Sequence, residues 1–129
     1  MPLKVVEAGN LKKGDAITLD NKHYIITKLE TSTTGKHGHT KVRLEAEDIF
    51  GKSKKVTVVP GHERIEVPEI KKQNAQVLTV KEKKANIMDL DTYETIDVKI
   101  DESLVGEIEE EETVEYWDVE GDKIIKRKL

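Results

Sequence analysis

The chain contains no cysteine, which excludes disulfide bonds and metal sites built from thiolates. It has no apolar run long enough to span a membrane. It also shows no signal-peptide pattern, because Lys4 and Glu7 interrupt the N-terminal segment. From these absences we expect a soluble, unexported, cytoplasmic protein with no membrane partner. The lack of cysteine fits a reducing compartment without proving one.

The formal net charge of −4 is unevenly distributed over the 129 residues. Residues 1–68 hold 12 Lys and Arg against 9 Asp and Glu, whereas residues 69–129 hold 10 against 17. The acidic second half argues against uniform coating by nucleic acid, so we expect no DNA partner. The mildly basic first half, which contains all four histidines, still permits a localised contact with RNA.

Alternation of apolar and polar residues predicts short β-strands in the first half. Val42, Leu44 and Ala46 alternate with charged neighbours. In the preceding strand, the same pattern predicts that Tyr24, Ile26 and Lys28 share one face. Five or six such strands, separated by turn residues, predict a small SH3-like barrel over residues 1–68. Pro68 cannot continue a strand ladder and coincides with the change in charge, so we place the domain junction at about residues 67–71.

The second half also alternates as strands. Three strands, one short helix and two strands are predicted there, at residues 73–80, 84–90, 94–100, 101–106, 113–119 and 123–129 in turn. This order matches a five-stranded oligonucleotide-binding (OB) barrel. The chain is therefore predicted to be all-β, with an SH3-like domain at residues 1–68 and an OB-fold domain at residues 69–129.

A polar segment, TTGKHGHTK, runs from Thr33 to Lys41 between two predicted strands. It is longer than a hairpin connection normally needs, and long ordered loops in compact domains are usually functional. Gly35 and Gly38 allow sharp turns on either side of Lys36. We therefore expect this lysine to be held outward on an exposed loop.

Three chemical interpretations of the segment find little support. A phosphate-binding P-loop is excluded because Glu30 stands where that motif needs glycine and His37 where it needs Ser or Thr. His37 and His39 lack a third metal ligand nearby in the sequence, so no metal is expected. Lys36 is too exposed to be a desolvated nucleophile, and no catalytic triad or carboxylate pair is evident, so we expect no enzyme activity. An amine presented to another molecule and an ordinary exposed lysine remain as interpretations.

The string STTGKHGHTKV, residues 32–42, closely resembles the hypusine loop of the translation initiation factor 5A family of archaea and eukaryotes, which is related to bacterial elongation factor P. The resemblance extends along nearly the whole chain, including LKKGD at residues 11–15 and PGHERIEVP at residues 60–68. The archaeal members are the better fit because the chain starts close to its first strand. Thr33 and Thr40 depart from residues common in eukaryotic members, but neither change affects Lys36.

This resemblance implies a translation factor that binds the ribosome beside peptidyl-tRNA and rRNA. It would promote peptide-bond formation and elongation at stalling sequences such as consecutive prolines. Deoxyhypusine synthase would attach an aminobutyl group from spermidine to Lys36, giving deoxyhypusine, which some lineages hydroxylate to hypusine; no cofactor is implied. The loop residues implied to contact the acceptor end of tRNA are Thr34, Gly35, His37, Gly38, His39 and Lys41.

Two alternatives remain open. A general RNA-binding module of SH3-like and OB barrels, with unmodified Lys36, predicts salt-sensitive binding to free RNA. A metal-binding interaction protein using His37 and His39 predicts stoichiometric zinc.

The second half is acidic and has few aromatic residues, so we assign no contact residues there and expect Trp117 to lie in the core.

Overall fold

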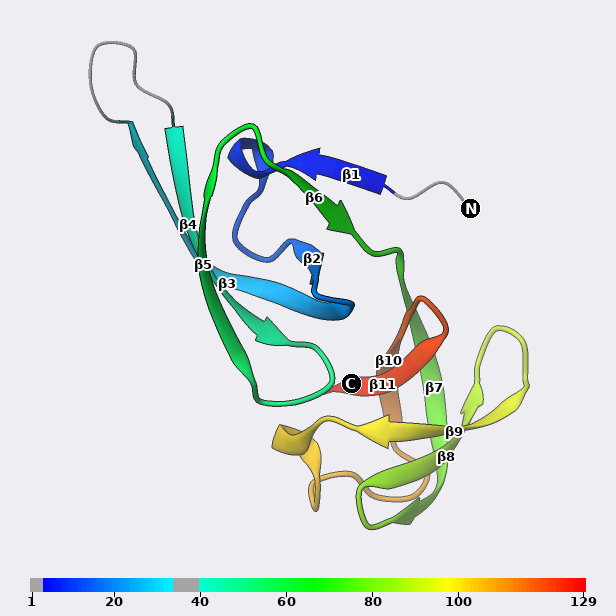
Figure 1. Ribbon diagram of the computed structural model, residues 1–129. Coiled ribbons are helices and arrows are strands. Elements are labelled where there is room, and N and C mark those ends of the chain that lie inside the picture. Colours follow the sequence, from blue (N-terminus) through cyan, green and yellow to red (C-terminus); the bar gives the residue numbers. More distant parts are fainter. Residues whose placement is uncertain (1–3, 34–39) are drawn as a thin grey trace. The chain divides into compact units, whose positions relative to one another are not determined.

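The structure is a computed structural model that describes residues 4–33 and 40–129. In that part of the chain the regular elements are β-strands and two 3-10 turns, which confirms the all-β prediction (Figure 1). The chain divides into two compact units, Met1–Pro68 and Glu69–Leu129. Each unit has a hydrophobic core of its own.

The N-terminal unit is a curved, six-stranded SH3-like sheet in which every neighbouring pair of strands is antiparallel. Its strands are β1 Lys4–Glu7, β2 Ala16–Leu19, β3 Lys22–Thr33, β4 Thr40–Asp48, β5 Lys54–Pro60 and β6 Arg64–Val67. They lie in the order β1-β6-β2-β3-β4-β5, so β1 and β5 are the edge strands. The 3-10 turn η1, Ala8–Asn10, follows β1.

The alternation predicted for β4 is confirmed, because Val42, Leu44 and Ala46 are buried in the core of this unit. The alternation predicted for β3 holds for Tyr24 and Ile26, which are buried, but it does not continue regularly to Lys28, which is exposed. The pairing of β3 with β4 shifts between Ile26 and Lys28, so Leu29 and not Lys28 lies opposite Leu44. An extra residue in one strand of a pair is called a β-bulge. Beyond it, each side chain points to the face of the sheet opposite to the one that simple alternation predicts, and the sequence pattern alone does not reveal it.

The turn between β2 and β3 consists of Asp20 and Asn21, whose φ angles are 51° and 65°. Two consecutive residues of positive φ form the hairpin turn whose twist matches that of the flanking strands. Asp and Asn tolerate this conformation better than other residues with side chains. The local sequence therefore sets the register in which Leu19 pairs with Lys22.

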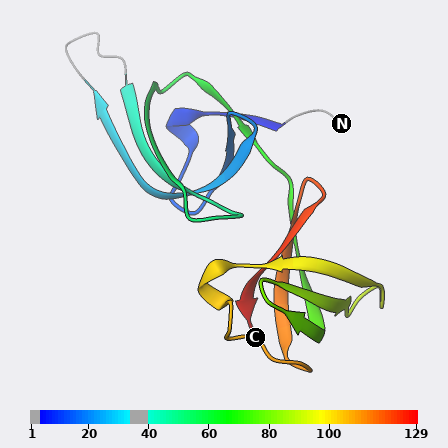
Figure 2. The ribbon, with the colours of Figure 1, turned by 60° about the horizontal axis from the view of Figure 1, so that its bottom comes forward.

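The C-terminal unit is a closed barrel in the order β10-β11-β9-β8-β7, with β7 also paired to β10 (Figure 2). Its strands are β7 Ile70–Lys81, β8 Lys84–Asp89, β9 Thr95–Ile100, β10 Thr113–Val119 and β11 Asp122–Lys128. Only β9 and β11 of the described strands run parallel to each other. This closed five-stranded arrangement confirms the predicted OB architecture.

The short helix predicted between β9 and β10 is a single 3-10 turn, η2, Glu102–Leu104. Asp101 precedes it without making a side-chain cap, and Gly106 follows it with a φ of 84°. Three residues complete no α-helical turn with i to i−4 hydrogen bonds, so the segment adopts the tighter geometry. No helix in residues 4–33 and 40–129 is long and apolar enough to cross a membrane.

Trp117 does not lie in the core, contrary to the prediction. Successive residues of a strand point to opposite faces, and in β10 the core positions are Val114 and Tyr116. The indole ring instead lies under two lysines, with the Nζ atoms of Lys72 and Lys126 at 4.6 and 5.6 Å from its centroid. Its Nε1 donates to Glu115 at 3.0 Å.

Candidate functional site

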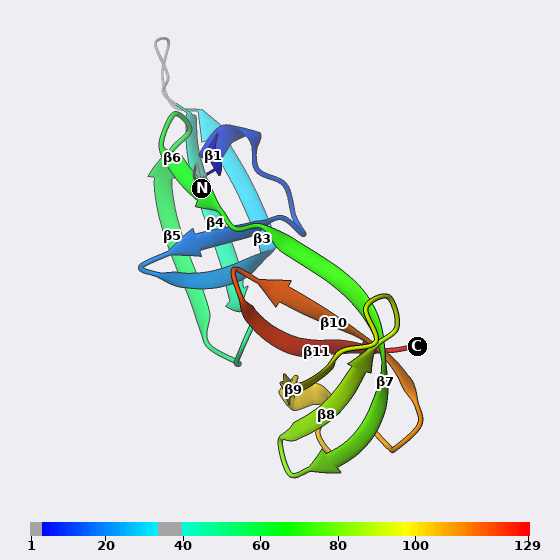
Figure 3. The same ribbon diagram turned by 90° about the vertical axis from the view of Figure 1, so that its right-hand side faces the viewer.

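The predicted site is carried by the β-hairpin of β3 and β4. Six of its residues, Thr34 to His39 and therefore Lys36, lie outside the described residues. The structure does describe the two strands that bear them and Lys41, the exposed second residue of β4. Figure 3 shows β3 and β4 side by side within the sheet of the N-terminal unit.

The hairpin is paired as far as the last described residue on each side. Nine residue pairs connect β3 with β4, from Tyr24 opposite Asp48 to Thr33 opposite Thr40. The hydroxyl groups of Thr33 and Thr40 lie 3.3 Å apart, within hydrogen-bonding distance. The two attachment points of residues 34–39 are thus neighbours across a strand pair, with Cα atoms on the order of 5 Å apart.

The end of the hairpin that leads into residues 34–39 is braced by two glycines from elsewhere in the chain. The amide of Gly61 donates to the carbonyl of Thr40 at 2.7 Å, and the amide of Gly9 donates to the carbonyl of Gly61 at 2.9 Å. A Cβ atom on Gly61 would lie 3.3 Å from the Cβ and carbonyl oxygen of Thr40, and one on Gly9 would lie 3.2 Å from the carbonyl oxygen of Gly61. A side chain at either position would press on its neighbour, because three backbone segments are closely stacked there.

Sequence reasoning missed this brace. From the sequence, neither Gly9 nor Gly61 is assigned a structural role. A glycine after a strand indicates that two backbones approach closely, but it does not say which backbone is the neighbour.

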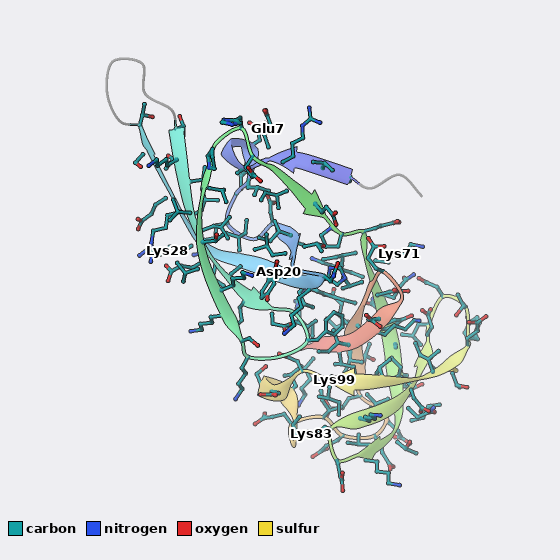
Figure 4. The ribbon with its side chains drawn as sticks, viewed as in Figure 1. Glu7, Asp20, Lys28, Lys71, Lys83 and Lys99 are labelled. Carbon is teal, nitrogen blue, oxygen red and sulfur yellow. The ribbon has the colours of Figure 1, made fainter. Side chains whose placement is uncertain are left out.

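Charged residues on the outer face of the hairpin are mostly paired with one another. Lys28 lies 3.2 Å from Glu30 and 3.9 Å from Glu45, and Arg43 lies 3.4 Å from Glu45. Figure 4 shows the Lys28 side chain on the solvent side of the hairpin. Such exposed pairs contribute little stability, about 0–1 kcal/mol each. In the described residues Lys41 has no such partner, which leaves its charge available next to residues 34–39.

A metal centre has no support from the described part of the chain. No group of three or more His, Asp or Glu side chains is placed there to hold an ion. His23 is engaged with the hydroxyl of Thr18 at 2.8 Å. His37 and His39, the two candidate zinc ligands from the sequence, lie outside the described residues. The described residues supply no cluster of further ligands for a zinc ion.

The C-terminal unit contains one buried carboxylate, Asp89, which is 4 % exposed. Its Oδ1 accepts the amides of Asp91 at 2.7 Å and Thr92 at 3.1 Å, and its Oδ2 accepts the hydroxyl of Tyr116. Burial acts to raise the pKa of Asp89, but these hydrogen bonds outweigh it and hold the pKa below the usual value. Burial and the neighbouring carboxylate raise the pKa of Tyr116.

This buried pair supports the turn between β8 and β9. Asp89 bonds to amides of its own turn, and Tyr116 belongs to the core of the barrel. Structural hydrogen-bond networks of this kind also perturb pKa values.

Comparison with known proteins identifies similar chains over nearly the full length. A family described as translation initiation factor 5A-like, N-terminal, matches residues 3–63. A translation initiation factor 5A of Methanosphaera stadtmanae is 41 % identical over 127 residues, covering 98 % of this chain and 96 % of the relative. The translation initiation factor 5A of Metallosphaera sedula is 36 % identical over 129 residues, covering 98 % of each.

Solved structures agree with this similarity. A protein described as eukaryotic translation initiation factor 5A from Methanococcus jannaschii has a TM-score of 0.88 and 36 % identity, covering 98 % of this chain and 95 % of that one. A family member from Naegleria fowleri has a TM-score of 0.74 and 30 % identity, covering 98 % and 99 %.

Proposed function

The chain belongs to the translation initiation factor 5A family, and on that premise we propose that it binds the ribosome beside peptidyl-tRNA and promotes peptide-bond formation at stalling sequences such as consecutive prolines. Lys36, carrying an aminobutyl group, is the residue through which it acts. The observation that supports this most is the braced β3–β4 hairpin, which bears Lys36 between Thr33 and Thr40.

Modification lengthens the Lys36 side chain and adds a second amine. In the transfer, the Nζ of Lys36 forms a bond to a butyl carbon of spermidine, the bond from that carbon to the central nitrogen breaks, and diaminopropane leaves. One C–N bond replaces another, so the exchange has no net oxidation or reduction. The product carries positive charge farther from the backbone, where RNA phosphates and ribose hydroxyls can accept its hydrogen bonds.

The proposed role of the protein is to position the tRNA end, which requires no acid or base on this chain. Holding a reactant in a productive orientation removes part of the entropic barrier to reaction. A hairpin held by cross-strand pairs and by the Gly61 amide loses less conformational freedom on binding than a flexible segment would. Thr34, Gly35, His37, Gly38, His39 and Lys41 are proposed to contact the acceptor end together with Lys36.

Two measurements test this function. Intact mass of the protein from its own host is expected to show one aminobutyl group, or its hydroxylated form, and peptide mapping is expected to place the group on Lys36. A Lys36→Arg variant is expected to fold as the parent does and to lose stimulation of polyproline synthesis in reconstituted translation. Full stimulation by that variant, or an unmodified Lys36 in the host, would contradict the proposal; salt-sensitive RNA binding that is independent of modification would favour the general RNA-binding alternative.

A further inference from the structure

Strand β5 presents an apolar row on the outer face of the N-terminal sheet. Val56 and Val58 are 51 % and 56 % exposed, and Pro60 continues the row at the end of the strand. They alternate along the strand, so all three project from the same face. Among the described strands β5 pairs only with β4, and it lies at one margin of the sheet in Figure 3.

The apolar surface on this strand is local. Single apolar side chains on a surface are normal, and β5 also carries Lys54, Lys55 and Pro60, residue types that discourage an edge strand from pairing with another chain. They do not cover Val58, which projects from the face of the sheet and is more than half exposed. Val58 and Pro60 therefore offer exposed apolar surface to a partner.

A groove adjoins the end of this row at Val58 and Pro60 and has a volume of about 380 Å³. We call it the β5 groove; its lining residues are Thr40, Lys41, Val58, Val59, Pro60 and His62. Val58 and Pro60 thus belong both to the exposed row and to the groove. Among the described residues, Val58, Val59 and Pro60 give the groove a mostly apolar lining, which suits an apolar side chain of a protein partner.

The groove lies at the foot of the segment that carries Lys36. Thr40 follows Lys36 by four residues, and four residues span at most about 14 Å when fully extended. The Cα of Thr40 therefore lies within about 14 Å of the Cα of Lys36, so a protein seated against Thr40 is close to the lysine that is modified. The groove is well placed for an enzyme that acts on Lys36.

Charge at the rim indicates the chemistry of the occupant. Lys41 lies on the rim and makes no ion pair among the described residues, whereas Lys28 and Arg43 are paired with Glu30 and Glu45. A carboxylate of the partner would complement Lys41. An enzyme that binds spermidine, which is a polycation, also needs an acidic surface around its substrate.

We propose that the β5 groove docks an apolar segment bearing a carboxylate, supplied by the enzyme that transfers the aminobutyl group to Lys36. The apolar part of this segment packs on Val58 and Pro60, and its carboxylate pairs with Lys41. The inference rests on the proposed function, because it assumes that Lys36 is modified. Lys41 then serves the modifying enzyme first and RNA afterwards.

The test measures aminobutyl transfer by deoxyhypusine synthase with spermidine, using the unmodified full chain as substrate. Val58→Asn removes apolar surface from the groove, and Val56→Asn is the matched control because it changes the same strand and face outside the groove. Val58→Asn is expected to raise KM about tenfold with kcat unchanged, as loss of about 1.4 kcal/mol of binding requires. Val56→Asn is expected to leave KM unchanged, and Lys41→Glu to raise it.

A second readout separates docking from catalysis. A Lys36→Ala chain accepts no aminobutyl group but is expected to compete with the wild-type substrate, and adding Val58→Asn is expected to weaken that competition. Circular dichroism checks that each variant is folded. If Val58→Asn does not fold, Lys41→Glu becomes the test variant, because the Lys41 side chain is exposed and its replacement should not affect folding.

The outcomes distinguish the two proposals. Transfer to wild-type chain with equal KM for all variants would overturn the groove assignment and leave the proposed function intact. The same result, combined with a ribosomal defect of modified Val58→Asn, would show that the groove serves the ribosome. If the wild-type chain accepts no aminobutyl group, the proposed function fails and the groove assignment fails with it.

Discussion

Replacing Tyr116 by Phe removes the hydroxyl that donates to the buried carboxylate of Asp89. Hydrogen bonds to charged groups contribute about 1.5–3 kcal/mol, more than neutral ones, because an unpaired buried charge is costly. We expect Tyr116→Phe to lower the free energy of unfolding of the C-terminal unit by about 2 kcal/mol at pH 7. For a unit of this size, that loss corresponds to a fall in Tm of about 8–16 °C.

The destabilisation is expected to depend on pH in a defined direction. The folded-state pKa of Asp89 lies below the usual value, so its contribution is present above the unfolded pKa of about 3.9 and is lost as pH falls through the folded pKa. The Tyr116→Phe loss is therefore largest at neutral pH. Below about pH 4 it shrinks toward about 1 kcal/mol, the contribution of a neutral hydrogen bond.

Urea unfolding at pH 7 and pH 3, followed by fluorescence, measures both effects. The chain has one tryptophan, Trp117, and it reports on the unit that is changed. Tyr93→Phe is the matched control because Tyr93 lies in the same unit and is 72 % exposed. Equal losses for the two variants, or a Tyr116→Phe loss that grows on acidification, would refute the reasoning.

Two further predictions concern the N-terminal unit. Gly61→Val places side-chain atoms against Thr40, so we expect a loss of about 1–3 kcal/mol in a thermal melt and slower aminobutyl transfer to Lys36. Gly51→Val is its control because a Cβ there has only ordinary contacts, and equal effects of both would argue against the brace. Asn21→Val forces a β-branched residue to a φ of 65°, so we expect a loss of about 1–3 kcal/mol by circular dichroism. Asn21→Gly is expected to cost nothing, and an unaffected Asn21→Val would contradict the turn assignment.

Part of the fold followed from local pattern alone. The alternation around Leu44 and the succession of strands along the second half follow from neighbouring residues, and Asp20-Asn21 is a local sequence that favours a turn. These features depend on side-chain facing and backbone φ, which a residue and its neighbours largely set. The importance of Lys36 likewise followed from a short motif, and it stays a prediction because residues 34–39 are not described.

Other features depend on residues that are distant in the chain. The shift beside Thr27 and the position of Trp117 outside the core are set by pairing with neighbouring strands, which alternation alone does not specify. The brace joins Gly9, Thr40 and Gly61, and the β5 groove joins the start of β4 to the end of β5. The sequence was sufficient to single out a lysine between two glycines, because that motif is contiguous. Only the tertiary structure shows how the loop end of the hairpin is held and which surface lies beside it. Both features depend on packing between segments up to about fifty residues apart.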